Sequence, residues 1–240
     1  FGELDKVIHV VTPEQTSFFK VTFKVEELLD EKKYKNKQFH LIYEWVKLKA
    51  GKMSSREGNV IEANWLIDEI KNKILKKFNC DEEIAEILAV ASAKYSFLKN
   101  GTQTIIHFDI DESIAVDGNS APYLIYTYVR CQSVLKKSNN YLVDDRLIDN
   151  IILNNDESSV LRLINQFPEI VQQATIQLSP NLIANYLYDL AQKYSYFYQK
   201  NKILESEEKT KQFRLMLTQV TGKVIKEGLY LLGIKTVERM

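Results

Sequence analysis

Apolar residues recur every three to four positions from about residue 64 to the end of the chain. One such run consists of Leu66, Ile67, Ile70, Ile74 and Phe78. A second consists of Ile84, Ile87, Leu88, Ala91, Tyr95 and Leu98. This period places apolar side chains on one face of a helix. The sequence therefore predicts a mainly α-helical protein whose helices pack as a bundle.

The same pattern predicts further helices toward the end of the chain. Residues 144–178 have the periodicity of two helices, with a kink at Pro168, where the ring interrupts backbone hydrogen bonding. We expect a long helix over residues 181–203 and a last helix that begins near Ser206 and stops at Gly233.

The first 50 residues follow a different pattern. Residues 5–11 are β-branched and apolar, as in a buried strand, and a helix is expected to begin near Glu14. A second strand is predicted over residues 39–46. Strand, helix and strand in this order are typical of a nucleotide-binding α/β unit.

A loop with glycines, hydroxyls and cations follows the second strand. It runs from Gly51 to Asn59 and contains Lys52, Ser54, Ser55 and Arg56. Glycine lets a backbone approach a ligand closely, while hydroxyls and cations suit phosphate oxygens. The composition favours either a polyphosphate-binding loop or an ordinary solvated turn.

Residues 120–130 combine tyrosines with an arginine. Tyr123, Tyr126 or Thr127, and Arg130 fall on one face of a helix. Such a face can stack on an unpaired RNA base and bind its phosphate. The alternative is that the tyrosines are core residues with hydroxyls at the rim.

The predicted helix over residues 181–203 contains many aromatic residues, namely Tyr186, Tyr188, Tyr194, Tyr196, Phe197 and Tyr198. So many aromatic side chains cannot share one helix face. We therefore expect some of them to point outward, where they could take part in recognition.

Charge and cysteine content restrict the class of protein. The formal net charge is zero, so a nucleic acid would have to be bound by local patches. Cys80 and Cys131 are far apart and are expected to be reduced thiols of a cytoplasmic protein. The sequence has no apolar run of transmembrane length, so we expect no membrane partner.

Acidic residues gather between residues 101 and 119, namely Asp109, Asp111, Glu112 and Asp117. Their spacing does not match an EF-hand loop. We interpret this segment as a solvated loop with an extended piece, and we expect no metal site.

Residues 52–56 (Lys-Met-Ser-Ser-Arg) resemble the Lys-Met-Ser-Lys-Ser loop of class I aminoacyl-tRNA synthetases. With Glu57-Gly58-Asn59-Val60 after it, the loop is similar to the arginyl-tRNA synthetase version. The resemblance implies that Lys52, Ser54, Ser55 and Arg56 act on the ATP phosphates during adenylation.

The same resemblance implies residues that bind the nucleotide and the amino acid. Lys52 and Met53 would bind ATP, and Gln15 matches a glutamine beside the amino acid and adenosine pocket. Ser55 stands where the second lysine of the loop usually stands. Arg56, Lys49 and Lys47 are candidates for the charge that this lysine would supply.

Two later segments also resemble the arginyl family. Residues 120–130 are similar to its Gly-Pro-Tyr-Leu-Gln-Tyr-Ala-His-Ala-Arg segment, and residues 228–240 are close to its C-terminus. The family's anticodon-binding domain contains both segments. The resemblance implies a set of tRNA-binding residues: Tyr123, Tyr126, Arg130, Tyr198, Lys202 and Met240.

We therefore expect the C-terminal part of an arginyl-tRNA synthetase. Residues 1–65 would be the end of a Rossmann-like α/β catalytic domain, and residues 66–240 an α-helical anticodon-binding domain. The partners implied are arginine tRNA, with ATP, Mg²⁺ and L-arginine as substrates of the full-length enzyme. No tightly bound cofactor is expected, and the protein is expected to be a monomer.

The family's His-Ile-Gly-His element, which stacks on ATP, does not occur in this sequence. The chain also starts at Phe1 rather than at a methionine, which we interpret as a portion of a longer protein. We expect the chain to be inactive alone in making arginyl-adenylate. The alternatives are a non-catalytic tRNA- or RNA-binding helical module and a helical scaffold without an RNA partner.

Overall fold

The computed structural model describes residues 4–49, 62–138 and 151–240. The chain divides into two compact units. The small unit comprises residues 1–51 and 100–108, and the helical unit comprises residues 52–99 and 109–240. The domain boundary near residue 65 stays a prediction. No helix among the described residues is long and apolar enough to cross a bilayer.

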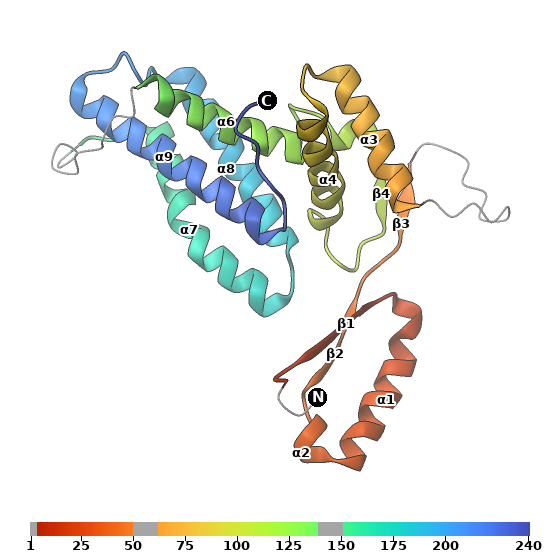
Figure 1. The fold of residues 1–240 in the computed structure, drawn as a ribbon. Coiled ribbons are helices and arrows are strands. Elements are labelled where there is room, and N and C mark those ends of the chain that lie inside the picture. The colour runs from red at the N-terminus through yellow and green to blue at the C-terminus, as the bar shows by residue number, and fades with distance from the viewer. Residues whose placement is uncertain (1–3, 50–61, 139–150) are drawn as a thin grey trace. The chain divides into compact units, whose positions relative to one another are not determined.

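The small unit begins with a β-α-β arrangement (Figure 1). Strand β1 (Val7–Val11) pairs in parallel with β2 (Gln38–Ile42), so that Val7 faces Gln38 and Val11 faces Ile42. Between them lie a 3₁₀ turn (Pro13–Gln15), α1 (Thr16–Leu29) and α2 (Glu31–Tyr34). The order of strand, helix and strand predicted from the sequence is confirmed.

Aromatic rings hold α1 against this sheet. The ring of Phe19 lies 5.0 Å from that of His9 on β1 and 4.7 Å from that of His40 on β2. Phe23 adds a contact with His9 at 5.4 Å. Aromatic pairs at these separations stabilise the packing of helix on sheet.

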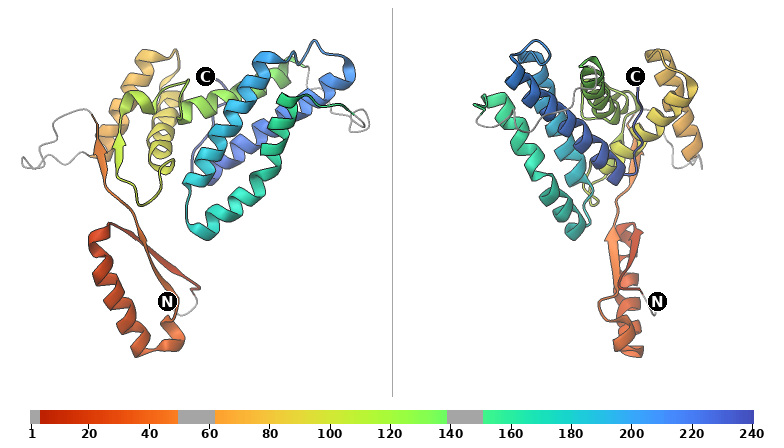
Figure 2. Two further views of the ribbon diagram at one scale, coloured as in Figure 1. Left: turned by 180° about the vertical axis from the view of Figure 1, so that it is seen from behind. Right: turned by 60° about the vertical axis from the view of Figure 1, so that its left-hand side comes forward.

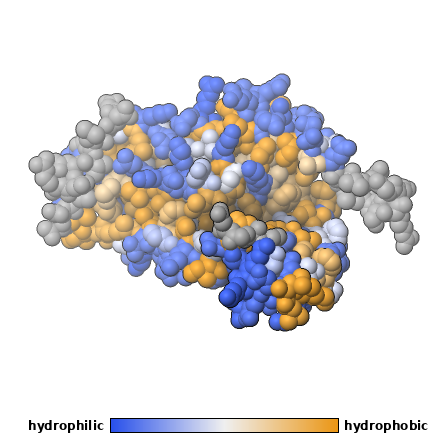
Figure 3. Space-filling model, turned by 60° about the horizontal axis from the view of Figure 1, so that its bottom comes forward, coloured by the Kyte–Doolittle hydropathy of each residue, from blue (hydrophilic) through white to orange (hydrophobic). Residues whose placement is uncertain are grey.

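The opposite face of α1 is apolar as well. Its exposed apolar side chains are Phe18, Val21, Val25, Leu28 and Leu29. Figure 3 shows orange, hydrophobic residues at the surface beside hydrophilic ones. The apolar surface of α1 therefore extends beyond the face that contacts the sheet.

The strand predicted over residues 39–46 is wrong in its extent. Strand β2 ends at Ile42, and a separate strand β3 (Val46–Leu48) begins four residues later. Strand β3 pairs in parallel with β4 (Ile106–Phe108), which comes from a distant part of the chain. Residues 38–48 therefore form two strands, because β2 pairs with β1 whereas β3 pairs with β4.

The helical unit consists, in its described residues, of seven helices. Two of them form a hairpin: α3 (Ala63–Lys77) packs on α4 (Glu82–Leu98). After the short helix α5 (Ile110–Ser113) come four long helices, namely α6 (Ala121–Lys137), α7 (Asn155–Gln177), α8 (Asn181–Lys200) and α9 (Glu208–Leu231). Helix α6 packs on α9 and α7 packs on α8 (Figures 1 and 2). The predicted mainly helical fold is confirmed.

Side chains cap the starts of several of these helices. Asp81 accepts a hydrogen bond from the backbone N–H of Ile84 at the start of α4. Asn154 and Glu157 form a reciprocal capping box at the start of α7. At the end of α9, Gly233 has φ of +67°, the left-handed conformation that glycine adopts without strain. Local sequence signals therefore define these helix ends.

The acidic segment is more ordered than expected. It contains the expected extended piece as β4, and it also contains the short helix α5, which the sequence did not predict. Asp109 caps α5, while Asp111 pairs with Lys73 at 2.6 Å and Glu112 pairs with Lys99 at 3.1 Å. The carboxylates thus hold α5 onto α3 and α4.

The prediction of two helices over residues 144–178 can be compared with the structure only from residue 151. This described part contains one helix, α7, with Pro168 in its interior. Residues 144–150 lie outside the described residues.

Candidate nucleic-acid interface

Helix α6 has an apolar inner face and a polar outer face. Leu124, Ile125, Tyr128 and Cys131 are buried on its inner side. A second set repeats at the same helical spacing and reaches the surface: Tyr126, Arg130, Ser133 and Lys137. This spacing aligns the four side chains along one side of the helix.

The aromatic residues of α8 divide between core and surface. Tyr186, Tyr194 and Phe197 are buried, whereas Tyr196 is 53% exposed and Tyr198 39% exposed. The expectation that some of these residues point outward is confirmed.

The buried hydroxyls on α8 have hydrogen-bond acceptors in the core. Tyr186 Oη donates to the carbonyl oxygen of Leu163 at 2.8 Å, and Tyr194 Oη donates to Thr218 Oγ1 at 3.2 Å. Burial raises the pKa of both tyrosines, so both remain neutral hydrogen-bond donors. These two tyrosines are structural.

Arg130 lies between two tyrosine rings. Its guanidinium carbon is 4.6 Å from the ring centroid of Tyr126 and 5.1 Å from that of Tyr198. Its Nη1 donates to Ser195 Oγ at 3.3 Å. Cation–π contacts of this kind contribute about 0.5–1 kcal/mol each at exposed sites. The two ring contacts and the hydrogen bond to Ser195 thus position the guanidinium group of Arg130.

Tyr123 belongs to the same cluster. Its hydroxyl donates to Ser195 Oγ at 3.2 Å, and its ring meets that of Tyr188 edge-on at 5.7 Å. Four of the six tRNA-binding residues implied by the resemblance, Tyr123, Tyr126, Arg130 and Tyr198, therefore meet between α6 and α8.

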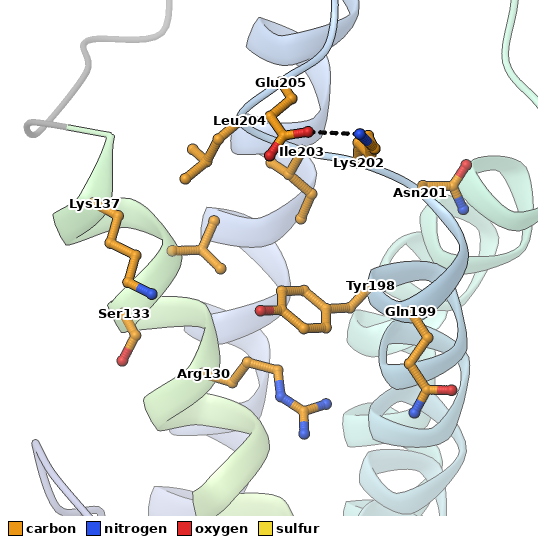
Figure 4. A pocket seen from close by; sticks show the side chains of 11 residues that line it. Arg130, Ser133, Lys137, Tyr198, Gln199, Asn201, Lys202, Ile203, Leu204 and Glu205 are labelled. Carbon is orange, nitrogen blue, oxygen red and sulfur yellow. Dashed lines mark hydrogen bonds and ion pairs between the residues drawn. The ribbon is translucent and has the colours of Figure 1, made fainter.

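A cavity of about 510 Å³ opens beside Arg130 and Tyr198 (Figure 4). Ser133 and Lys137 line it from α6, and Gln199 lines it from α8. The turn between α8 and α9 contributes Lys202, Ile203, Leu204 and Glu205. The cavity is large enough for a planar heterocycle and offers hydrogen-bond donors and acceptors at its wall.

Cations outnumber anions around this cavity. Of the residues that the structure describes, Arg130, Lys137 and Lys202 line it, together with one carboxylate, that of Glu205. Lys202 Nζ lies 2.7 Å from Glu205 Oε2. The hydrogen bond to Lys202 lowers the pKa of Glu205 and raises the pKa of Lys202. The ion pair therefore stays charged at neutral pH.

Sequence reasoning missed several of the lining residues, among them Ser133, Lys137, Gln199 and Glu205. The first two could have been found, because they continue the helical spacing of Tyr126 and Arg130. Glu205 has no such signal, since it lies in a turn without regular structure.

Met240 is not among the residues that line this cavity. It lines a second cavity of about 440 Å³ with Asn79, Cys80 and Asp81. There Arg239 Nη2 lies 3.2 Å from Asp81 Oδ2. Five of the six implied tRNA-binding residues are thus brought together, and Met240 lies apart from them.

The residues implied for ATP are placed only in part. Gln15 is exposed in the turn before α1 of the small unit. Lys52, Met53, Ser54, Ser55 and Arg56 lie outside the described residues. Among the described residues, no three His, Cys, Asp or Glu side chains gather into a group that could hold a metal ion.

Comparison with known proteins finds relatives over nearly the whole length of the chain. Residues 124–240 match the DALR anticodon binding domain family. The whole chain is similar to curated proteins named arginine–tRNA ligase. One is from Fusobacterium nucleatum, at 34% identity over 99% of this chain and 43% of the relative. Another is from Bacteroides thetaiotaomicron, at 35% identity over 99% of this chain and 42% of the relative.

The fold is similar to that of solved arginyl-tRNA synthetases. The Thermus thermophilus structure matches with a TM-score of 0.86 at 25% identity, over 98% of this chain and 41% of that one. The chain thus spans about two fifths of the length of the relatives that it matches.

Proposed function

The chain belongs to the arginyl-tRNA synthetase family, as a C-terminal part with the DALR anticodon-binding domain, and on this premise we propose that its helical unit binds arginine tRNA. The parent activity is the ATP-dependent joining of arginine to that tRNA. This chain supplies tRNA recognition to that reaction.

The observation that carries the proposal is the position of Arg130 between Tyr126 and Tyr198 at the edge of the cavity. An unstacked base can lie on an exposed tyrosine ring, and polar side chains at the cavity wall such as Ser133 and Gln199 can hydrogen-bond to the edge of that base. The guanidinium and the ammonium groups of Lys137 and Lys202 then neutralise neighbouring phosphates.

The first part of the chain serves the adenylation step in this proposal. Lys52, Ser54, Ser55 and Arg56 bind the ATP phosphates, with Met53 and Gln15 beside the nucleotide. Their support is the sequence resemblance. Mg²⁺ enters with ATP, and L-arginine is the second substrate. We also place the protein in the cytoplasm as a monomer.

Direct binding tests the proposal. Fluorescence anisotropy with a labelled arginine tRNA transcript measures the dissociation constant of its complex with the chain. The same measurement on a transcript with an unrelated anticodon loop provides the comparison. We expect tighter binding of the arginine tRNA. Three cations line the cavity, so log K should fall with log salt concentration at a slope of about −2.

Each alternative predicts a different result in the same experiment. Equal affinity for the two transcripts would indicate a general RNA-binding module without anticodon recognition. Absence of measurable binding to either transcript would indicate a helical scaffold and would contradict the proposal.

A further inference from the structure

Part of the cavity wall is a turn without regular secondary structure. Residues 201–207 connect α8 to α9, and five of them line the cavity beside Tyr198. Lys202 and Glu205 in this turn are exposed. A segment of this kind needs contacts from elsewhere to have a fixed position.

Arg214 on α9 supplies those contacts. Its Nη1 donates to the carbonyl oxygen of Lys202 at 2.6 Å and to Ser206 Oγ at 2.9 Å. Its Nη2 reaches Asn201 Oδ1 at 3.4 Å. One guanidinium therefore contacts the beginning and the end of the turn.

The same guanidinium is anchored on α7. Its Nε donates to Glu157 Oε1 at 2.7 Å, and both side chains are largely buried, at 13% and 3% exposure. The other oxygen of Glu157 accepts the backbone N–H of Asn154 at 2.9 Å, as part of the capping box. Both oxygens of the buried carboxylate are thus engaged, which fixes the guanidinium plane.

Asn201 extends the network to α8. Its Nδ2 donates to Asp156 Oδ2 at 3.0 Å and to the carbonyl oxygen of Phe197 at 3.1 Å. Asn154 Nδ2 donates to Asn201 Oδ1 at 2.8 Å. The end of α8, which carries Tyr198, is therefore connected to the start of α7.

We infer that Arg214 is a positioning residue for tRNA binding, because it orders the 201–207 turn and so places Lys202 at the cavity. This inference rests on the proposed function. A lysine at position 214 would keep the charge for Glu157 but lose the planar fork that reaches several acceptors at once.

A double-mutant cycle with Lys202→Ala tests the inference. In the unmodified background, Arg214→Lys should weaken binding of arginine tRNA about fivefold. In the Lys202→Ala background, the same change should weaken it less than twofold, because the residue that it positions is absent. Arg162→Lys, at an exposed position on α7, is the matched control and should leave affinity unchanged.

Amide hydrogen exchange gives a readout that does not depend on tRNA. Arg214→Lys should accelerate exchange in residues 202–206 and leave the rest of α8 unchanged. Ser206→Ala removes one hydrogen-bond partner of Arg214 and should accelerate exchange in the same residues to a smaller extent. This variant replaces Arg214→Lys in the experiment if Arg214→Lys does not fold.

Unchanged exchange in the turn, or an equal loss of affinity in both backgrounds, would overturn the inference. Failure of the unmodified chain to bind tRNA would instead overturn the proposed function. Hydrogen exchange would then still decide whether Arg214 orders the turn.

Discussion

Among the described residues that line the cavity between α6 and α8, Glu205 is the one acidic residue. Its carboxylate is paired with Lys202 and would repel an RNA phosphate at the same place. Both side chains are more than two thirds exposed, so the pair adds little to stability. Its effect on an approaching polyanion is larger, because RNA must compete with Glu205 for the ammonium group.

Glu205→Gln should therefore increase affinity for arginine tRNA about two- to fivefold at low salt, with the gain fading as salt screens the charges. Glu169→Gln, the same charge change at an exposed position on α7, is the matched control. Equal gains from both variants would show that net charge, and not release of Lys202, is responsible. Anisotropy titrations at two salt concentrations measure the difference.

The two thiols should differ in their rates of alkylation, because Cys80 is partly exposed and Cys131 is buried. Burial raises the pKa of Cys131 to about 12, so almost no thiolate exists at pH 8. In the native chain, iodoacetamide should modify Cys80, which is partly exposed, before Cys131. Peptide mass spectrometry measures both rates. Alkylation of Cys131 as fast in the native as in the denatured chain would contradict the buried position.

The raised pKa of Cys131 also has a consequence for stability. The folded chain favours the neutral thiol. Burial of Cys131 therefore makes its full contribution to the free energy of unfolding below the ordinary thiol pKa near 9. It is lost progressively as pH rises toward about 12. Burial of Tyr186 and Tyr194 acts in the same direction at alkaline pH.

At the scale of elements, α8 and α9 approach each other closely at Gly228. A Cβ added there would lie 2.6 Å from Leu187 Cδ2, and Leu187 is fully buried. Gly228→Ala should lower the free energy of unfolding by about 1–3 kcal/mol through overpacking. Gly118→Ala is the control, because its Cβ would meet its nearest neighbour at 3.7 Å. Urea unfolding measures both, and equal effects would contradict the close approach.

Helices could be predicted from the sequence because their signals are local. The apolar period and caps such as Asp81 and Ser120 lie within the segments that they define. The break between β2 and β3 has no local signal, since β3 pairs with Ile106–Phe108, about 60 positions away. Helix α5 has a local cap in Asp109, but it is only four residues long, and its ion pairs with Lys73 and Lys99 come from distant parts of the chain.

The candidate site could be predicted only as far as its residues lie on one helix. Tyr123, Tyr126 and Arg130 follow from helical spacing on α6. The spacing on α8 does not indicate that Tyr194 is buried and Tyr198 exposed, because α8 has aromatic residues on several sides. Packing of α8 with α7 and α9 decides which of them reach the surface.

At the scale of the whole molecule, recognition depends on local placement rather than on overall charge. Lysine and arginine balance aspartate and glutamate at 32 each, so no general attraction to RNA exists. Affinity must then come from the few side chains at the cavity. On the proposed function, Tyr198, the exposed tyrosine of α8 at that cavity, contacts the tRNA directly.

Tyr198 and Tyr196 provide the most direct test, because both are exposed on α8 and Tyr196 is not among the residues that line the cavity. The measurement is the dissociation constant for arginine tRNA of Tyr198→Ala and of Tyr196→Ala, with circular dichroism to confirm the fold. Tyr198→Ala should raise the dissociation constant for arginine tRNA about tenfold, because base stacking is lost. Tyr196→Ala should leave this constant within twofold of that of the unmodified chain. Equal affinities for the two variants would contradict the claim that the cavity between α6 and α8 binds the tRNA.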